Sequence, residues 1–278
     1  MVPLWSVSLV FGLAVVAALM RHQYELGAHG GFFPIAGVLA VAGCMAENSC
    51  ISWYRYYSYS PDWGLFLGYV PLHVVLIWPL FILGEHQYLR RLLPLGSLGL
   101  RACFCFVDTV LLANLVEIYC VSAGLWSWRE SNCLGVPLMG PIGWALFATP
   151  AVLLLAVQER ATGGQTHRSR ILAIPLVCMV VLHVGLWSLW NSVGKHLSNW
   201  SFSPSFEAAG ICAVQLCYEA ARSKASRRMQ GLALQKEVPR LLACGIVAAL
   251  WLLKGTPDPG ICLVSLASLL RLLAFRLA

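Results

Sequence analysis

Charged residues are scarce in this sequence. Of its 278 residues, 11% are Asp, Glu, Lys or Arg, and 59% are hydrophobic. Soluble domains average about 25% charged residues, because a water-facing surface cannot be built from fewer. We therefore expect most of the outer surface to face lipid, and the chain to form one transmembrane domain over residues 1–278.

Motifs for metal, nucleotide and nucleic-acid chemistry are also missing. The His residues lack the spacing of a di-iron site, and no D-D-x-x-D cluster could hold Mg²⁺ for the ionisation of a prenyl diphosphate. There is no G-x-S-x-G elbow, P-loop or dinucleotide fingerprint, and no basic stripe for nucleic acid. We expect no metal, no cofactor and no nucleic-acid partner, and we find no internal repeat. A cofactor-free acid–base mechanism fits what remains.

Long apolar runs fill the chain instead. A bilayer span needs about 20 mostly apolar residues. Nine runs qualify, at approximately 3–20, 31–46, 64–83, 102–124, 134–157, 171–190, 206–221, 241–253 and 261–277. The seventh run is polar for a span and the eighth is short. The pattern predicts an all-α, polytopic helical bundle in the membrane, with seven to nine transmembrane helices.

Basic residues alternate between successive loops. The loops after the first, third, fifth and seventh runs hold most of them, including Arg90, Arg91 and Arg101 after the third run. The intervening loops hold one each: Arg55, Arg129, Lys195 and Lys254. Loops rich in Lys and Arg are cytoplasmic under the positive-inside rule. We therefore expect the N-terminus outside and the C-terminus in the cytoplasm, with membrane lipids around the chain.

Acidic residues inside the apolar runs are candidates for function. An ionisable side chain in hydrocarbon costs about 2.5–3.5 kcal/mol on insertion scales. Asp108 and Glu117 lie inside the fourth run, and Glu47 ends the second run on the outer side. Helical geometry puts Asp108 and Glu117 on opposite faces, whereas Asn114 shares the face of Glu117. We expect the catalytic acid among Glu117, Glu47 and Asp108, and we expect Asn114 to line a cavity with Glu117.

Aromatic residues crowd the loops on the outer side. Glu47 is followed by Trp53-Tyr54-Arg55-Tyr56-Tyr57-Ser58-Tyr59, and the fourth run is followed by Trp126-Ser127-Trp128. An interfacial aromatic belt accounts for some of them. Aromatic faces also stabilise cations, and a desolvated carboxyl group stays protonated and ready to donate. Acids next to aromatics therefore suit the protonation of a carbon–carbon double bond.

Two ordered sets of residues resemble the membrane-embedded carotenoid hydratases, the family of carotenoid 1,2-hydratase and bisanhydrobacterioruberin hydratase. The first set is Glu47, the Tyr-rich loop, Gly68-Tyr69-Val70-Pro71-Leu72 and Trp78. The second is Glu117, Trp126-Ser127-Trp128, Gly135-Val136-Pro137 and Gly143-Trp144. The resemblance covers about residues 40–150. The sequence departs from the family pattern at Ile118, where Pro is usual, and at Gly140-Pro141, where Asn-Phe is usual.

The resemblance implies an enzyme of carotenoid biosynthesis. Such an enzyme protonates a terminal double bond of an acyclic carotenoid within the bilayer and adds water to the tertiary cation. Residues expected to contact this isoprenoid substrate are Asn114, Tyr54, Tyr56, Tyr57, Tyr59, Trp78, Trp126, Trp128 and Trp144. Two alternatives stay open. One is a membrane terpenoid cyclase that uses the same acid to start ring closure, and the other is a non-enzymatic lipid-binding subunit or small transporter.

Cysteine labelling tests the orientation. Single cysteines introduced into residues 53–63 and 222–240 of a cysteine-free variant are expected to react with an impermeant thiol reagent from opposite sides of the membrane. The first segment should react from outside and the second from the cytoplasm, because the second is rich in Lys and Arg. Reaction of both segments from one side contradicts the orientation.

Overall fold

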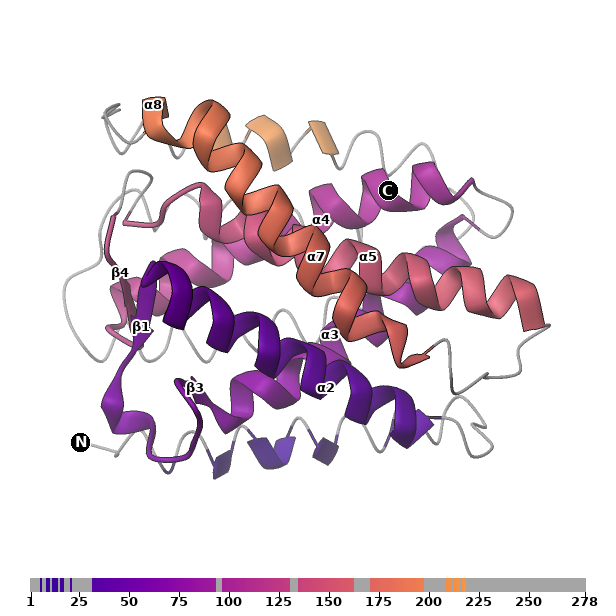
Figure 1. The fold of residues 1–278 in the computed structure, drawn as a ribbon, viewed down its shortest axis with the longest axis horizontal. Helices are drawn as coiled ribbons and strands as arrows, with labels where there is room; N and C mark the ends of the chain where they lie inside the picture. Colours follow the sequence, from indigo (N-terminus) through magenta and orange to yellow (C-terminus); the bar gives the residue numbers. More distant parts are fainter. Residues whose placement is uncertain are drawn as a thin grey trace, which may run out of the picture. The chain divides into compact units, whose positions relative to one another are not determined.

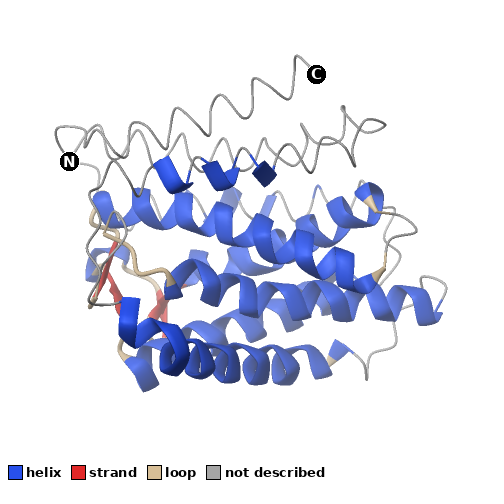
Figure 2. Ribbon diagram, turned by 90° about the horizontal axis from the view of Figure 1, so that it is seen from above, coloured by secondary structure: helices blue, strands red, loops and turns tan. Residues whose placement is uncertain are grey.

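The structure is a computed structural model that describes residues 32–93, 97–130, 135–162 and 171–197, with scattered positions within 6–21 and 209–218. These residues are mostly helical (Figure 1). The long helices are α2 (Phe32–Ser49), α3 (Leu72–Leu92), α4 (Leu98–Ser122), α5 (Met139–Thr162) and α7 (Ala173–Leu189). The short segments are the π-helices η1 (Cys50–Tyr54) and η3 (Trp190–Gly194), the 3₁₀-helix η2 (Pro61–Trp63), α8 (Lys195–Leu197), and the strands β1 (Tyr57–Tyr59), β2 (Phe66–Leu67), β3 (Val70–Pro71) and β4 (Trp126–Trp128). Figure 2 shows that the strands are short and stand at helix ends.

Five helical stretches of the described residues are long and apolar enough to cross a membrane: Phe33–Tyr54, Leu72–Leu92, Leu98–Ser122, Met139–Ala161 and Ala173–Gly194. At 1.5 Å per residue, such helices reach about 30 Å, the thickness of the hydrocarbon core. These stretches agree with the predicted polytopic helical membrane protein. The runs at 3–20, 206–221, 241–253 and 261–277 lie largely or wholly outside the described residues. A total of seven to nine helices therefore stays a prediction.

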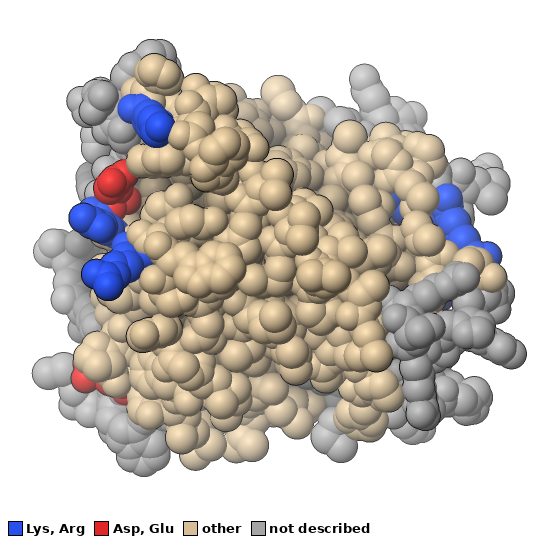
Figure 3. All heavy atoms as spheres, in the orientation of Figure 1, with Lys and Arg blue, Asp and Glu red and all other residues tan. Residues whose placement is uncertain are grey.

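Charged side chains avoid the middle of the face that Figure 3 shows. In the space-filling view of Figure 3, described Lys, Arg, Asp and Glu side chains gather toward the helix ends, and the surface between them carries none. Helix α7 has the same character, because Leu176, Val180, Val184 and Trp187 recur at helical spacing and are each more than half exposed. A continuous apolar face of this kind is unusual on a soluble monomer. It fits contact with lipid.

Four of the five described helices begin and end within about five residues of the predicted runs, but the bounds predicted for the third run, 64–83, are wrong, because the helix there is Leu72–Leu92. Part of that run forms the hairpin of β2 and β3, in which Leu67 pairs with Val70. Gly68 at the turn has a φ of 67°, which glycine adopts freely and a helix cannot use. Helix α3 then starts at Leu72 and continues through Glu85, which is only 1% exposed.

The chain divides into two compact units, residues 1–87 with 146–185, and residues 88–145 with 186–278. In the first unit, Ile51, Val70 and Val75 form a small core that fixes β3 between the end of α2 and the start of α3. Figure 1 shows β1 and β3 near that end of α2. Because α3, α5 and α7 each continue from one unit into the other, the predicted single domain stays a prediction.

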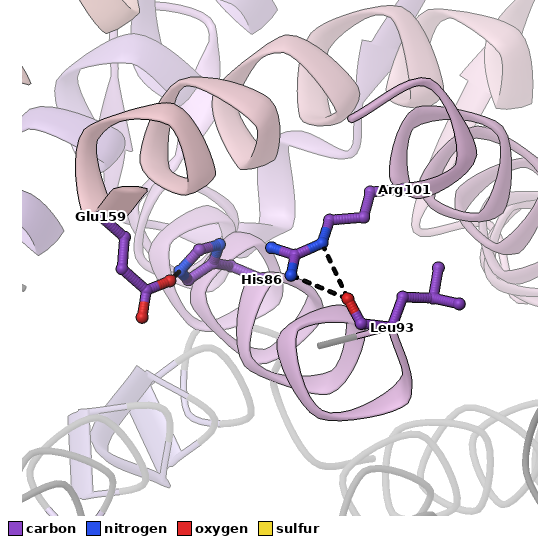
Figure 4. Close-up of polar contacts among 4 residues, drawn as sticks. All are labelled: His86, Leu93, Arg101 and Glu159. Atoms are coloured by element: carbon purple, nitrogen blue, oxygen red, sulfur yellow. Dashed lines mark hydrogen bonds and ion pairs between the residues drawn. The ribbon is translucent and has the colours of Figure 1, made fainter. Parts of the chain in front are cut away.

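Two polar contacts near helix ends are drawn in Figure 4, an ion pair between α3 and α5 and a pair of hydrogen bonds between α4 and the residue that follows α3. In the first unit, His86 Nε2 of α3 lies 3.5 Å from Glu159 Oε2 of α5. In the second unit, the guanidinium group of Arg101 donates to the Leu93 carbonyl from Nε at 3.2 Å and from Nη2 at 2.8 Å. The prediction that Arg101 lies in a loop is therefore wrong. It is buried in the first turn of α4, where it satisfies a carbonyl just beyond the end of α3.

Candidate functional site

The first glutamate site lies at the C-terminal end of α2. Glu47 is 6% exposed and accepts hydrogen bonds on both carboxylate oxygens. The hydroxyl groups of Tyr57 and Tyr59 donate to Oε2, the latter at 3.1 Å, and the Trp78 indole donates to Oε1 at 3.1 Å. A buried carboxylate needs such donors, because an unpaired charge in apolar surroundings is costly. We call Tyr57, Tyr59 and Trp78 the Glu47 cage.

Local structure positions each member of this cage. Residues two apart in a strand point to the same side, so β1 presents both tyrosines while Ser58 between them is exposed. Trp78 lies in α3 and packs edge-on against Phe147, with ring centroids 4.7 Å apart. Gly43, one turn before Glu47, makes room for the indole, because a Cβ there would lie 2.5 Å from the Trp78 ring.

Tyr57 stays a neutral phenol. Its pKa is raised well above the usual value of 10.0, first by burial and then by the nearby Glu47 carboxylate. A neutral phenol can both donate and accept a hydrogen bond. Tyr57 can therefore pair with Glu47 in either protonation state of the glutamate.

Asn48 holds the β2–β3 hairpin against α2. The hairpin connects the strand of the Glu47 cage to the start of α3. Its Oδ1 accepts the backbone N–H of Tyr69 at 2.7 Å, and its Nδ2 donates to the carbonyl of Leu67 at 3.0 Å. Gly68 lies against the Asn48 amide, where a Cβ would collide. The sequence did not single out Asn48, because its partners in the hairpin are backbone groups that leave no side-chain pattern.

Tyr54 and Tyr56, expected at the substrate site, belong to a separate cluster around His183 of α7. The two tyrosines stack with ring centroids 4.9 Å apart, and the Tyr54 hydroxyl lies 2.8 Å from His183 Nδ1. Ser49 Oγ lies 2.9 Å from His183 Nε2 and donates to the Ala46 carbonyl at 2.8 Å. Because the Ser49 proton is engaged there, we assign the imidazole proton to Nε2, which leaves Nδ1 to accept from Tyr54. The spacing of the His residues in the sequence gives no sign of this cluster.

The second glutamate site lies near the C-terminal end of α4. Glu117 is 3% exposed. The indoles of Trp126 and Trp128 donate to Oε2 at 2.7 and 2.8 Å, and that of Trp144 donates to Oε1 at 3.1 Å. We call these three residues the Glu117 cage. Strand β4 presents the first two on one side, with Ser127 exposed between them.

The packing of the Glu117 cage explains why residue 140 is a glycine. A Cβ at this position would lie 2.6 Å from the ring atom Cζ2 of Trp128. The indole of Trp128 fills the space that a side chain at Gly140 would need. Glycine at position 140 is therefore matched to the aromatic cage of this chain.

Asp108 and Asn114 are buried in α4 but are not members of the cage. Asp108 is 1% exposed and lies two and a half turns before Glu117. Asn114 is 8% exposed, one turn before Glu117, and its Oδ1 has no hydrogen-bond partner among the described residues. The structure thus groups Glu47 with Tyr57, Tyr59 and Trp78, and Glu117 with the three indoles. Catalytic and binding roles for all these residues stay predictions.

The two cages are copies of one motif. In each copy, a helix-borne glutamate is followed by a left-handed residue, an aromatic–Ser–aromatic strand, a glycine with positive φ, the tripeptide Val-Pro-Leu, and a Trp six residues after that Leu. In the first copy these are, in order, Glu47, Arg55, Tyr57–Tyr59, Gly68, Val70–Leu72 and Trp78. In the second copy they are Glu117, Gly124, Trp126–Trp128, Gly135, Val136–Leu138 and Trp144. The expectation of no internal repeat is therefore wrong.

A one-residue insertion separates the copies at the helix end. Glu47 precedes its first cage aromatic by ten residues, and Glu117 precedes its own by nine. The extra residue falls in η1, where the chain winds as a π-helix. A π turn holds one residue more than an α turn. Both strands therefore bring two aromatic side chains to the carboxylate in spite of the different spacing.

The described residues contain no group of three or more His, Cys, Asp and Glu side chains that could hold a metal ion. A scan against protein-family models, a search of curated proteins and a search of solved structures each found no match. The fold and the site thus define a class, a helical protein suited to the membrane with two glutamates held in aromatic cages.

Replacing Gly43 by Ala tests the packing of the Glu47 cage. The new methyl group would displace Trp78, and overpacking of this kind costs about 1–3 kcal/mol. Gly37 in the same helix has open space around its missing Cβ, so Gly37→Ala should raise helix stability by up to about 1 kcal/mol. Thermal unfolding in detergent, followed by tryptophan fluorescence, measures both effects. Equal melting temperatures for the two variants contradict the close contact.

Proposed function

We propose that this chain is a membrane-embedded isoprenoid hydratase that protonates a terminal double bond of an acyclic carotenoid and adds water to the resulting cation. One observation carries the proposal. A buried glutamate at a helix end is enclosed by three aromatic donors, and this arrangement occurs twice. In this arrangement a carboxyl group that can donate a proton lies next to electron-rich aromatic rings in apolar surroundings.

The reaction needs only a carboxyl group and water. The carboxyl proton moves to the CH carbon of the terminal double bond, where the π electrons form the new C–H bond, and the dimethyl carbon is left as a tertiary cation. A water oxygen bonds to that cation, and the oxonium ion then loses a proton that restores the acid. General acid catalysis of this kind contributes typically about 10²–10⁴-fold.

The aromatic rings support a cationic intermediate. Indole is the best cation–π partner among side chains, and such contacts strengthen where water is excluded. Four of the six cage residues are tryptophans. Each directs its N–H to a glutamate oxygen, which enriches the electron density of the ring. An isoprenoid cation next to such a ring is stabilised without a covalent bond.

The surroundings suit a substrate dissolved in lipid. The exposed face of α7 is apolar, and five described helices are long enough for a bilayer. From the alternating loop charges we further propose seven to nine spans, with the N-terminus outside and the C-terminus in the cytoplasm. An acyclic carotenoid would then reach the protein laterally from the membrane.

A terpenoid cyclase is the second candidate, and the Glu117 cage favours it if Glu117 donates the proton. Indoles offer no acceptor to hold a water molecule, and Gly140 adds no polar side chain beside that cage. A cyclase excludes water so that an internal alkene quenches the cation. The Glu47 cage favours hydration instead, because two tyrosine hydroxyls can hold an ordered water.

Glutamine substitutions test the acid. Whichever glutamate donates the proton, its Gln variant should lose roughly 10²–10⁴-fold in turnover. Membranes from a host that makes acyclic carotenoids, expressing Glu47→Gln or Glu117→Gln, are assayed by chromatography of the products. Asp62→Asn is the control, because Asp62 is an exposed acid outside both cages. Near-normal activity in both Gln variants removes acid catalysis by these residues.

Isotope labelling separates hydratase from cyclase. Incubation of the membranes with an acyclic carotenoid in ¹⁸O-labelled water should place the label in a tertiary hydroxyl group, as detected by mass spectrometry. An isomeric product without new oxygen would establish the cyclase. Recovery of unchanged carotenoid, with the protein folded, would favour a non-enzymatic lipid-binding subunit or small transporter.

A further inference from the structure

We infer that the two cages handle protons differently: the Glu47 cage exchanges a proton through its tyrosines, whereas the Glu117 cage holds a carboxylate that its three indoles cannot protonate. The Glu47 cage therefore supplies the acid of the proposed reaction. The assignment of the acid rests on the proposed function. Proton exchange at Glu47 stands on the local geometry alone.

In the Glu47 cage, both protonation states of the glutamate can be satisfied. The hydroxyl groups of Tyr57 and Tyr59 both contact Oε2. A phenol hydroxyl donates to a carboxylate and accepts from a carboxylic acid by rotation of one O–H bond. It can also give its proton to Glu47 while taking another from a neighbour. The two tyrosines thus form a path for protons to and from the carboxyl group.

In the Glu117 cage, the same two positions carry indoles. An indole N–H donates and has no lone pair with which to accept. Trp126 and Trp128 both direct N–H groups at Oε2, and Trp144 directs a third at Oε1. A proton on Oε2 would face two donors, so these three indole donors match a carboxylate. None of the three rings can pass a proton onward.

The repeat isolates this difference to two positions. Tyr57 corresponds to Trp126 and Tyr59 to Trp128, while the third donor is a tryptophan in both copies, Trp78 or Trp144. The copies share the glutamate, the strand and the helix that follows. The Glu47 cage can therefore relay protons, and the Glu117 cage holds an anion, because two phenols in the first are replaced by two indoles in the second.

The proton balance closes within the Glu47 cage. Glu47 gives its proton to the alkene carbon and becomes a carboxylate. After water has bonded to the cation, Tyr57 passes its hydroxyl proton to Glu47 and takes one from the oxonium ion. The product is a neutral tertiary alcohol, Glu47 is again protonated, and Tyr57 is again a phenol. No further acid, base or metal enters the cycle.

Infrared spectroscopy tests proton exchange without any substrate. Spectra of the membrane-reconstituted protein in H₂O and D₂O, taken as pH differences, report the C=O stretch of exchangeable protonated carboxyl groups. We expect one component of this band to disappear in Glu47→Gln and to persist in Glu117→Gln. Disappearance in Glu117→Gln, or no change in either variant, overturns the inference.

Matched substitutions test the relay. Tyr57→Phe removes one hydroxyl group with little change of shape, and it should slow deuterium exchange of the Glu47 band at least tenfold. Trp126→Phe removes the corresponding indole N–H, and it should leave that exchange rate as it is. Tyr59→Phe serves in place of Tyr57→Phe if the latter does not fold, as judged by its thermal unfolding. Equal exchange rates for the tyrosine and tryptophan variants overturn the relay.

The two proposals fail separately. If the infrared band belongs to Glu47 and the membranes convert no isoprenoid, the proposed function falls and the proton-exchanging cage stands. If product forms and Glu117→Gln loses the band and the turnover while Glu47→Gln keeps both, the function stands and the division between the cages falls. Loss of turnover in Glu47→Gln, together with loss of its band, supports both.

Discussion

A carboxyl group inside an apolar protein has to find its hydrogen-bond donors among nearby side chains, and the structure around both glutamates follows from that requirement. The helix that carries each glutamate cannot supply them, because its own N–H groups are committed to carbonyls one turn earlier. A short strand placed directly after the helix supplies two donors at once, since alternate residues face one way. The following helix supplies the third. Glycines at positions 43 and 140 then leave space for the indoles to reach the carboxylates.

Much of this could be predicted from the sequence, because its main features are unusual in their setting. Acids within apolar runs and aromatic residues in pairs marked Glu47, Glu117 and most of their partners. The predicted bounds of helix α3 are wrong because the hairpin before it is as apolar as a span, and the positive φ of Gly68 at the turn leaves no mark in the hydropathy. His183 escaped notice as a polar centre because its polar partners lie about 130 residues away in sequence. The repeat was missed because the two copies share few identical residues between the glutamate and Val-Pro-Leu.

The comparison of the copies shows how little has to change for a buried acid to change its character. Burial of Glu47 and Glu117 is nearly the same, at 6% and 3% exposed, and each accepts three aromatic hydrogen bonds from the same places in the motif. The environment differs in whether the donors can also accept. The protonation of a buried glutamate therefore depends on whether its partners donate or accept hydrogen bonds, as well as on the polarity around it.

The π turn at Cys50–Tyr54 has a consequence for the way such chains can diverge. A wider turn takes up one residue at the end of α2 and still delivers Tyr57 and Tyr59 to the carboxylate. The helix end therefore tolerates a change of length. An insertion there alters the number of residues between the glutamate and the strand, and the hydrogen bonds to the carboxylate are kept. Related proteins can differ by a residue at this place and keep the same carboxyl environment. Alignments that penalise a gap there will separate proteins that share the site.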